Sequence, residues 1–144
     1  AAVGGGATIL LHFDAVFISP NTKIKYPFSE LGLAPEVGSS YLLFQALGYQ
    51  QAAQLLFQSK IIDGTKYYEL GLAKYVGDDF LDQAYSYARD LKEQSLSSII
   101  ETKAILKSFM LEDLAKARSM ETKAMKKLFG SEDNLKAVEK FFNK

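Results

Sequence analysis

The sequence predicts an α/β fold in residues 1–77 and an α-helical region in residues 78–144. In the first part, short apolar runs bounded by proline, asparagine or glycine alternate with segments of helical pattern. From Asp78 onward, apolar residues recur at the three- and four-residue spacing of one helix face. The second part is therefore expected to form a small bundle of amphipathic helices with solvated lysine and glutamate faces.

The first elements are expected around a glycine run. Gly4–Gly6 precede the apolar stretch Ala7–Leu11, a pattern that predicts a tight loop leading into a buried helix. Asp14–Ser19 has the character of a short strand, and the alternating residues Lys23–Tyr26 are a candidate partner strand. Prolines and glycines then crowd residues 27–38, which predicts a shaped loop of the kind that carries binding and catalytic groups.

Helices follow this loop. A helix capped by Ser39–Ser40 is expected to end at Gly48, and a second helix over residues 50–60 follows it. Residues 65–70 predict a third helix, and residues 72–76 predict a last short strand before the terminal helices.

The composition excludes several classes of function. The chain has 17 basic and 17 acidic residues, without the basic excess of a nucleic-acid-binding protein. It has no cysteine, which rules out disulfides and thiol nucleophiles, and a single histidine, His12, which argues against an imidazole metal site. The apolar first residues meet His12 and Asp14 too early to span a bilayer. We therefore expect neither a nucleic-acid partner, nor a bound metal, nor a membrane span.

Several motifs occur in a fixed order along the chain. The glycine turn GGG is followed by a helix, an aspartate, a strand, the loop LGLAPEVGSS and the run LGYQQAAQLLFQSKIIDGTKYYELGL. This order and spacing resemble the crotonase superfamily of enoyl-CoA hydratases and isomerases, and SEDNLKAVEKFF is similar to that family's closing helix. The resemblance covers essentially the whole chain. It implies the C-terminal part of a crotonase α/β spiral in residues 1–77 and a helical oligomerisation region in residues 78–144.

The resemblance also implies a chemistry. Crotonases act on acyl-CoA thioesters through an enolate-like intermediate, whose oxygen is held by two backbone N–H groups. By its position in the glycine turn, Gly5 is expected to supply one of these donors. The second donor belongs to an earlier segment that this chain does not contain, so we expect the natural protein to have a further N-terminal portion. No separate cofactor is implied, because the substrate carries CoA.

Acidic residues distinguish the members of this family. Hydratases have two glutamates at positions where this sequence has Thr8 and Phe28. Glu36 instead stands in LAPEVGSS, which is similar to the peroxisomal-type delta3,delta2-enoyl-CoA isomerases and their single glutamate. One carboxylate suffices for a 1,3-proton shift, because it can take a proton from C2 and return it to C4. The resemblance thus implies an isomerase of fatty acid β-oxidation with Glu36 as its base. Apolar neighbours of Glu36 are expected to be Phe28, Leu33, Val37 and Leu42.

Each of these residues also has a plainer interpretation. Glu36 could be an exposed loop acid or a residue favoured by the dipole of the following helix. Glu30 matches no catalytic position of the family and is expected to be solvated, Asp14 is expected to be structural, and His12 a partly buried helix residue.

The C-terminus offers one further candidate site. In the family, an aromatic residue and a lysine three positions later reach the CoA of a neighbouring subunit, and Phe141 and Lys144 match that spacing. Core packing of Phe141 and a frayed end at Lys144 are the alternative. The resemblance implies a homo-trimer or a hexamer.

Two rival functions stay open at this point. One is a non-catalytic acyl-CoA-binding or scaffold protein of the same fold, and the other is a different crotonase reaction such as thioester hydrolysis. The chain ends in FFNK, which is no peroxisomal signal. We therefore expect the bacterial cytoplasm, with a peroxisome or mitochondrion as the alternative.

Overall fold

Two short parallel ladders form the strand layer in the computed structural model, which describes residues 1–143. Strand β1 (Ala2–Val3) pairs with β3 (Ile24–Lys25), and β2 (Phe17–Ile18) pairs with β4 (Tyr75–Val76). The prediction that β3 would partner the strand before it, β2, is therefore wrong.

Backbone hydrogen bonds explain this difference. One edge of β3 is taken by β1, and at the other Ile24 exchanges hydrogen bonds with Ile62 at 2.9 and 3.0 Å. Parallel partners need a long crossover connection, so they are distant in sequence and leave no local signal.

Three helices complete the first part of the chain: α1 (Gly5–Leu10), α2 (Ser39–Gln58) and α3 (Gly64–Glu69). The helical conformation of α2 is broken at Gly48, which has φ 74° and ψ 169°, where the sequence predicts a helix end. The expected Ser39–Ser40 cap is wrong, because the residue that caps α2 is Gly38, in a left-handed conformation with φ 82°.

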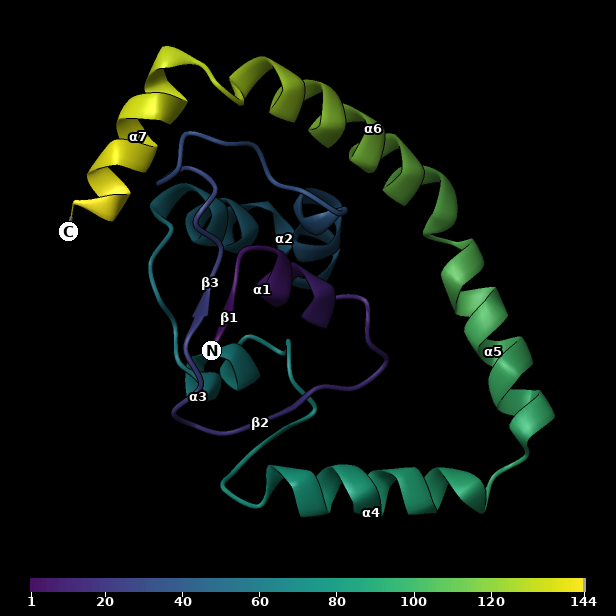
Figure 1. The fold of residues 1–144 in the computed structure, drawn as a ribbon. Coiled ribbons are helices and arrows are strands. Elements are labelled where there is room, and N and C mark those ends of the chain that lie inside the picture. The colour runs from purple at the N-terminus through teal and green to yellow at the C-terminus, as the bar shows by residue number, and fades with distance from the viewer. Residues whose placement is uncertain (144) are drawn as a thin grey trace.

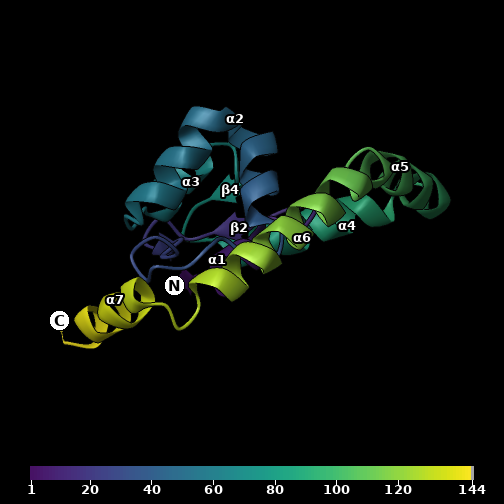
Figure 2. The same cartoon turned by 90° about the horizontal axis from the view of Figure 1, so that it is seen from above.

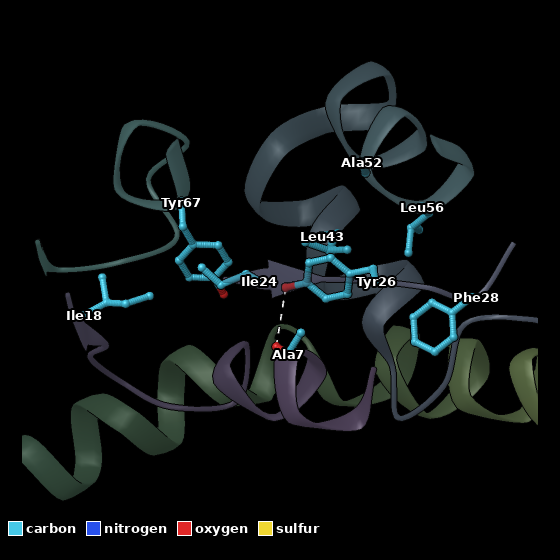
Figure 3. Close-up of a cluster of buried hydrophobic side chains, with 9 residues drawn as sticks. All are labelled: Ala7, Ile18, Ile24, Tyr26, Phe28, Leu43, Ala52, Leu56 and Tyr67. Carbon is cyan, nitrogen blue, oxygen red and sulfur yellow. Dashed lines mark hydrogen bonds between the residues drawn. The ribbon is translucent and has the colours of Figure 1, made fainter. Parts of the chain in front are cut away.

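A cluster of buried apolar side chains joins these helices to the strands (Figure 3). Ile24, Leu43 and Tyr67 have no accessible surface, and Tyr26 has 1%. The Tyr26 hydroxyl donates a hydrogen bond of 3.4 Å to the carbonyl of Ala7 in α1. Desolvation raises the pKa of Tyr26 far above its ordinary value, so this phenol stays a donor at all physiological pH. The contact fixes α1, and with it the glycine turn, against the core.

The remaining four helices follow one another in an arc around the core (Figure 1). We call them the terminal arm: α4 (Phe80–Lys92), α5 (Leu96–Ser108), α6 (Leu111–Leu128) and α7 (Glu132–Phe142). Figure 2 shows α2 and α3 rising on one side of the arm rather than between its helices. The expected small bundle is wrong, because a bundle needs connections that reverse the chain, and the short connections here only bend it. None of the helices within residues 1–143 is long and apolar enough to cross a membrane.

The terminal arm shows an inverted burial pattern. Among its described residues, the two that are buried are polar: Glu121 is 6% exposed and Asn134 is 4% exposed. Large apolar side chains of the arm face outward, including Phe109 at 76% and Leu96 at 69% exposure. The arm therefore meets the core through specific polar contacts and leaves its apolar faces uncovered.

Candidate functional site

The structure brings Glu36 and Gly5 together. A Cβ atom built on Gly5 would lie 3.2 Å from Oε1 of Glu36, and no other heavy atom of the surroundings lies within 4 Å of it. Glu36 is half-buried in the loop before α2, and Gly5 is exposed as the first residue of α1. The predicted base and the predicted oxyanion donor thus share one small site.

The glycine turn leaves the backbone N–H of Gly5 without an internal partner. Gly4, at φ 57°, donates its N–H to the carbonyl of Lys25 at 2.9 Å, and its own carbonyl accepts from Ala7 and Thr8 at 3.0 and 2.9 Å. Within residues 1–143, no hydrogen bond uses the N–H of Gly5, as expected for the first position of a helix. This N–H can therefore bind an oxygen placed beside Glu36.

The backbone that follows Glu36 is strained. Val37 has φ 55°, a conformation rare for a β-branched residue, and Gly38 follows at φ 82°. Such a residue costs of order 1–3 kcal/mol and persists only where its surroundings hold it. The carbonyl of Glu36 accepts a hydrogen bond of 3.0 Å from the N–H of Ser39, which closes the turn.

His12 is one of the residues that hold this turn. Its Nε2 lies 2.8 Å from the carbonyl oxygen of Val37. Because a carbonyl only accepts, Nε2 must carry the proton, which fixes the tautomer of a neutral ring. His12 is partly buried as expected, but it lies in the turn after α1 and not on a helix. Its contact with a loop 25 positions away has no local signature in the sequence.

Glu121 of α6 holds the other side of the turn. Its Oε2 accepts from the N–H of Gly38 at 2.7 Å, and its Oε1 accepts from the N–H and hydroxyl of Ser40 at 2.9 and 2.6 Å. The side chain of Leu114, about two turns before Glu121 in α6, packs over Gly38, since a Cβ added to Gly38 would lie 2.4 Å from Leu114 Cδ1. Sequence reasoning missed Glu121, because a glutamate among the lysines of a helix looks like one more solvated charge.

Asn134 of α7 holds the start of the same loop. Its Nδ2 donates to the carbonyl of Leu31 at 2.7 Å, while its Oδ1 accepts from the N–H of Gly130 at 2.9 Å. Gly32, at φ 64°, packs directly on this residue, since an added Cβ would lie 3.0 Å from Asn134 Cα. Sequence reasoning missed this contact as well.

The other loop acid, Glu30, differs from its prediction. It is not solvated but forms an ion pair with Lys25, and the two side chains are 23% and 16% exposed. Asp14 pairs with Lys103 of α5 at the surface, where such a contact contributes little to stability.

The two positions at which hydratases carry glutamate are uncharged and enclosed. Thr8 has no accessible surface and Phe28 is 4% exposed, so both side chains belong to the interior. Residues 1–143 also contain no group of three or more histidine, cysteine, aspartate or glutamate side chains arranged to hold a metal ion.

At the C-terminus, Phe141 is 41% exposed and packs edge-to-face against Phe142, with ring centroids 5.7 Å apart. Core packing of Phe141 is therefore wrong for this chain. Lys144 lies outside the described residues, and contact of this pair with CoA stays a prediction.

A groove of about 710 Å³ runs beside the site, between the end of α1 and helices α4 to α6. His12 and Leu114, which both touch the strained turn, form part of its wall. The remaining wall is mostly apolar and includes Leu91, Ile99 and Leu106.

Comparisons with known proteins find similarity to one family of enzymes. The sequence model of the family described as enoyl-CoA hydratase/isomerase matches residues 1–144. The Bacillus subtilis protein YhaR, which carries an enoyl-CoA hydratase/isomerase name, is 29% identical over 100% of this chain and 57% of its own length. The mouse enoyl-CoA delta isomerase 3, named as peroxisomal, is 37% identical over 52% of this chain and 24% of its own length. The crystal structure of an enoyl-CoA hydratase/isomerase from Pseudoalteromonas atlantica superposes with a TM-score of 0.92 at 27% identity, covering 99% of this chain and 58% of that one.

Proposed function

Because this chain belongs to the enoyl-CoA hydratase/isomerase family, we propose that the protein carrying it is a delta3,delta2-enoyl-CoA isomerase of fatty acid β-oxidation. Glu36 is its single base, and the N–H of Gly5 is one of its two oxyanion donors. The observation that carries this proposal is the approach of Glu36 Oε1 to 3.2 Å from a Cβ built on Gly5; among residues 1–143, no other carboxylate lies within 4 Å of that position.

The proposed reaction follows from these two groups. The thioester oxygen of a 3-enoyl-CoA accepts a hydrogen bond from Gly5, and Glu36 removes a proton from C2. The electron pair of the broken C–H bond moves into an enolate, whose developing negative charge the N–H stabilises. The protonated Glu36 then delivers the same proton to C4, and the double bond comes to lie between C2 and C3. One carboxylate is enough, because the proton removed from C2 is the proton returned to C4. No separate cofactor takes part, because CoA is carried by the substrate.

The number of carboxylates in the site also distinguishes isomerisation from hydration. Addition of water needs one group to activate the water and another to protonate carbon. Thr8 and Phe28 are buried and cannot act as acids or bases, which supports isomerisation. Relatives that match the whole chain carry hydratase or hydratase/isomerase names, whereas those named as isomerases match part of it.

We expect the full-length protein to convert a 3-enoyl-CoA to the conjugated 2-trans-enoyl-CoA while hydrating 2-enoyl-CoA negligibly. Formation of the conjugated thioester can be followed by its absorbance, and hydration by the loss of that absorbance from a 2-enoyl substrate. Efficient hydration without isomerisation would contradict the assignment. Binding of acyl-CoA without either reaction would instead favour a non-catalytic scaffold.

The chain spans 57% of the length of YhaR, so the rest of the proposed site is expected outside it. We place the second oxyanion donor and much of the CoA pocket in that remaining part. A bacterial cytoplasmic location stays a prediction.

Self-association is expected from the apolar faces of the terminal arm. Large apolar side chains along the arm are exposed, among them Phe109 and Leu96, and a homo-trimer or hexamer would cover them. Sedimentation of the full-length protein at micromolar concentration should show an oligomer. The Phe109→Glu variant, which places a charge at a position 76% exposed, should shift it toward smaller species while leaving the fold intact. A clean monomer would remove the proposed contact of Phe141 and Lys144 with a neighbour's CoA.

A further inference from the structure

Side chains of the terminal arm form hydrogen bonds with both ends of the segment that carries Glu36. We call residues 31–40 the Glu36 loop. Asn134 of α7 binds its first residue, Leu31, and Glu121 of α6 binds Gly38 and Ser40 near its end. These are the same two side chains that are buried in α4 to α7 among the described residues. The arm's buried contacts with the core thus converge on one loop.

We propose that Glu121 is a positioning residue for the reaction, whose buried carboxylate clamps Gly38 and Ser40 and so holds Glu36 against Gly5. This inference rests on the proposed function, because it assigns Glu36 the role of the base. It adds a residue from a distant helix that does not itself touch the reacting atoms.

The hydrogen bonds of Glu121 are of the strong kind. An ionised carboxylate accepts three of them, two from backbone N–H groups at the N-terminal end of α2 and one from a hydroxyl. Both oxygens are used, and each faces at least one N–H donor. No neutral side chain of this size can present two acceptors in these directions, so the clamp needs a carboxylate.

The loop needs such a clamp because its backbone is strained. Val37 and Gly38 are both in the left-handed region, directly after Glu36. If they lost their acceptor, the buried N–H of Gly38 and the part-buried N–H of Ser40 would be left without a partner, and the turn would relax to find one. A displacement of about 1 Å at a reacting group can cost about 100-fold in rate. Glu36 lies two residues from Gly38, so relaxation of the turn would move its carboxylate away from Gly5.

A simpler role for Glu121 is that of a stabilising cap for α2. The two roles predict different kinetics. A cap that acts only on stability lowers the amount of folded enzyme but leaves the turnover of each folded molecule unchanged. A positioning residue lowers kcat in the folded enzyme, with little change in KM, because substrate is bound mainly by other groups.

The test is Glu121→Gln in the full-length protein, with Glu101→Gln as the matched control. Glutamine keeps the size but turns one acceptor into an N–H₂ group, which must face the N–H of Gly38 or of Ser40. We expect kcat on a 3-enoyl-CoA to fall about 10- to 100-fold, with KM nearly unchanged, in protein shown to be folded by circular dichroism. Glu101 is an exposed glutamate of α5, and its variant should match the wild type. A folded Glu121→Gln protein with wild-type kcat would overturn the proposal.

A double-mutant cycle with Glu36→Gln separates positioning from stability. If Glu121 acts through Glu36, adding Glu121→Gln to Glu36→Gln should cost nothing further, because no base is left to position. Equal fold-losses in both backgrounds would show that Glu121 acts independently of Glu36 and would overturn the proposal. Wild-type turnover in Glu36→Gln alone would remove the proposed function, and the positioning role with it.

Should Glu121→Gln fail to fold, Ser40→Ala decides the question. This change removes one of the three donors to Glu121 and keeps both backbone N–H groups. A smaller fall in kcat in the same direction, at constant KM, supports the clamp. An unchanged kcat contradicts it.

Discussion

Replacing Glu36 with glutamine is expected to lower isomerase turnover by about 100- to 10,000-fold, the usual contribution of a general acid–base group. Glutamine is almost the same size and keeps a carbonyl acceptor, so the site should retain its shape. It takes up no proton at accessible pH, so both removal at C2 and delivery at C4 fail. The measurement is single-substrate kinetics on a 3-enoyl-CoA together with a direct measurement of acyl-CoA binding, which should stay nearly intact.

The alternative roles of Glu36 predict a much smaller effect. A loop acid that only favours the start of α2 contributes about 0.3–1 kcal/mol to stability, and its loss would leave turnover nearly unchanged. Glu101→Gln again serves as the control for a lost surface charge. A folded Glu36→Gln variant with ordinary turnover would remove the base and favour a scaffold or a different crotonase reaction.

The second large effect concerns Gly5. Two substitutions there distinguish loss of the N–H donor from crowding of Glu36 by an added side chain. Gly5→Pro removes the N–H, and proline is well tolerated at the first position of a helix. Gly5→Ala also places a Cβ 3.2 Å from Glu36 Oε1, without the other two carbons of the proline ring, and it keeps the N–H. Because loss of one oxyanion donor costs about 100- to 1,000-fold in kcat, Gly5→Pro should be slower than Gly5→Ala by about that factor.

Initial rates at saturating substrate for the two variants, with circular dichroism as the folding control, make the comparison. Equal losses in the alanine and proline variants would show that crowding of Glu36, rather than the N–H, explains the effect. Gly5 would then lose its assigned role, while Glu36 would keep its own.

The site was largely predictable because its signals are local. Neighbouring residues encode the glycine turn, the short helix after it and the proline-rich loop. The order of these motifs predicts the crotonase fold. That fold is confirmed by the family match and by the solved structure that superposes on 99% of the chain. The nearness of Glu36 to Gly5 follows from the same fold, whereas their roles remain predictions.

The parts that escaped prediction depend on contacts between distant residues. The partner of β3 is set by parallel pairing with β1 and by a bridge to Ile62, neither of which has a local pattern. The path of the terminal arm was missed because helical periodicity gives the faces of helices and not their directions. Glu121 and Asn134 were missed because burial of a polar residue is decided by what docks on it, and the sequence around them is that of an exposed helix.

The clamp between α6 and the Glu36 loop also bears on when the site is assembled. Glu121 follows Gly38 by 83 positions. Synthesis proceeds at about 5–20 residues per second, so the ribosome needs roughly 4–17 s after Gly38 to reach Glu121. During that interval the glycine turn and the loop are already made, but the acceptor for Gly38 and Ser40 does not yet exist. A nascent chain that stalls before α6 would therefore carry Glu36 on a turn contacted by His12 but not by Glu121, and the proposed positioning of Glu36 would be complete only once α6 has been made.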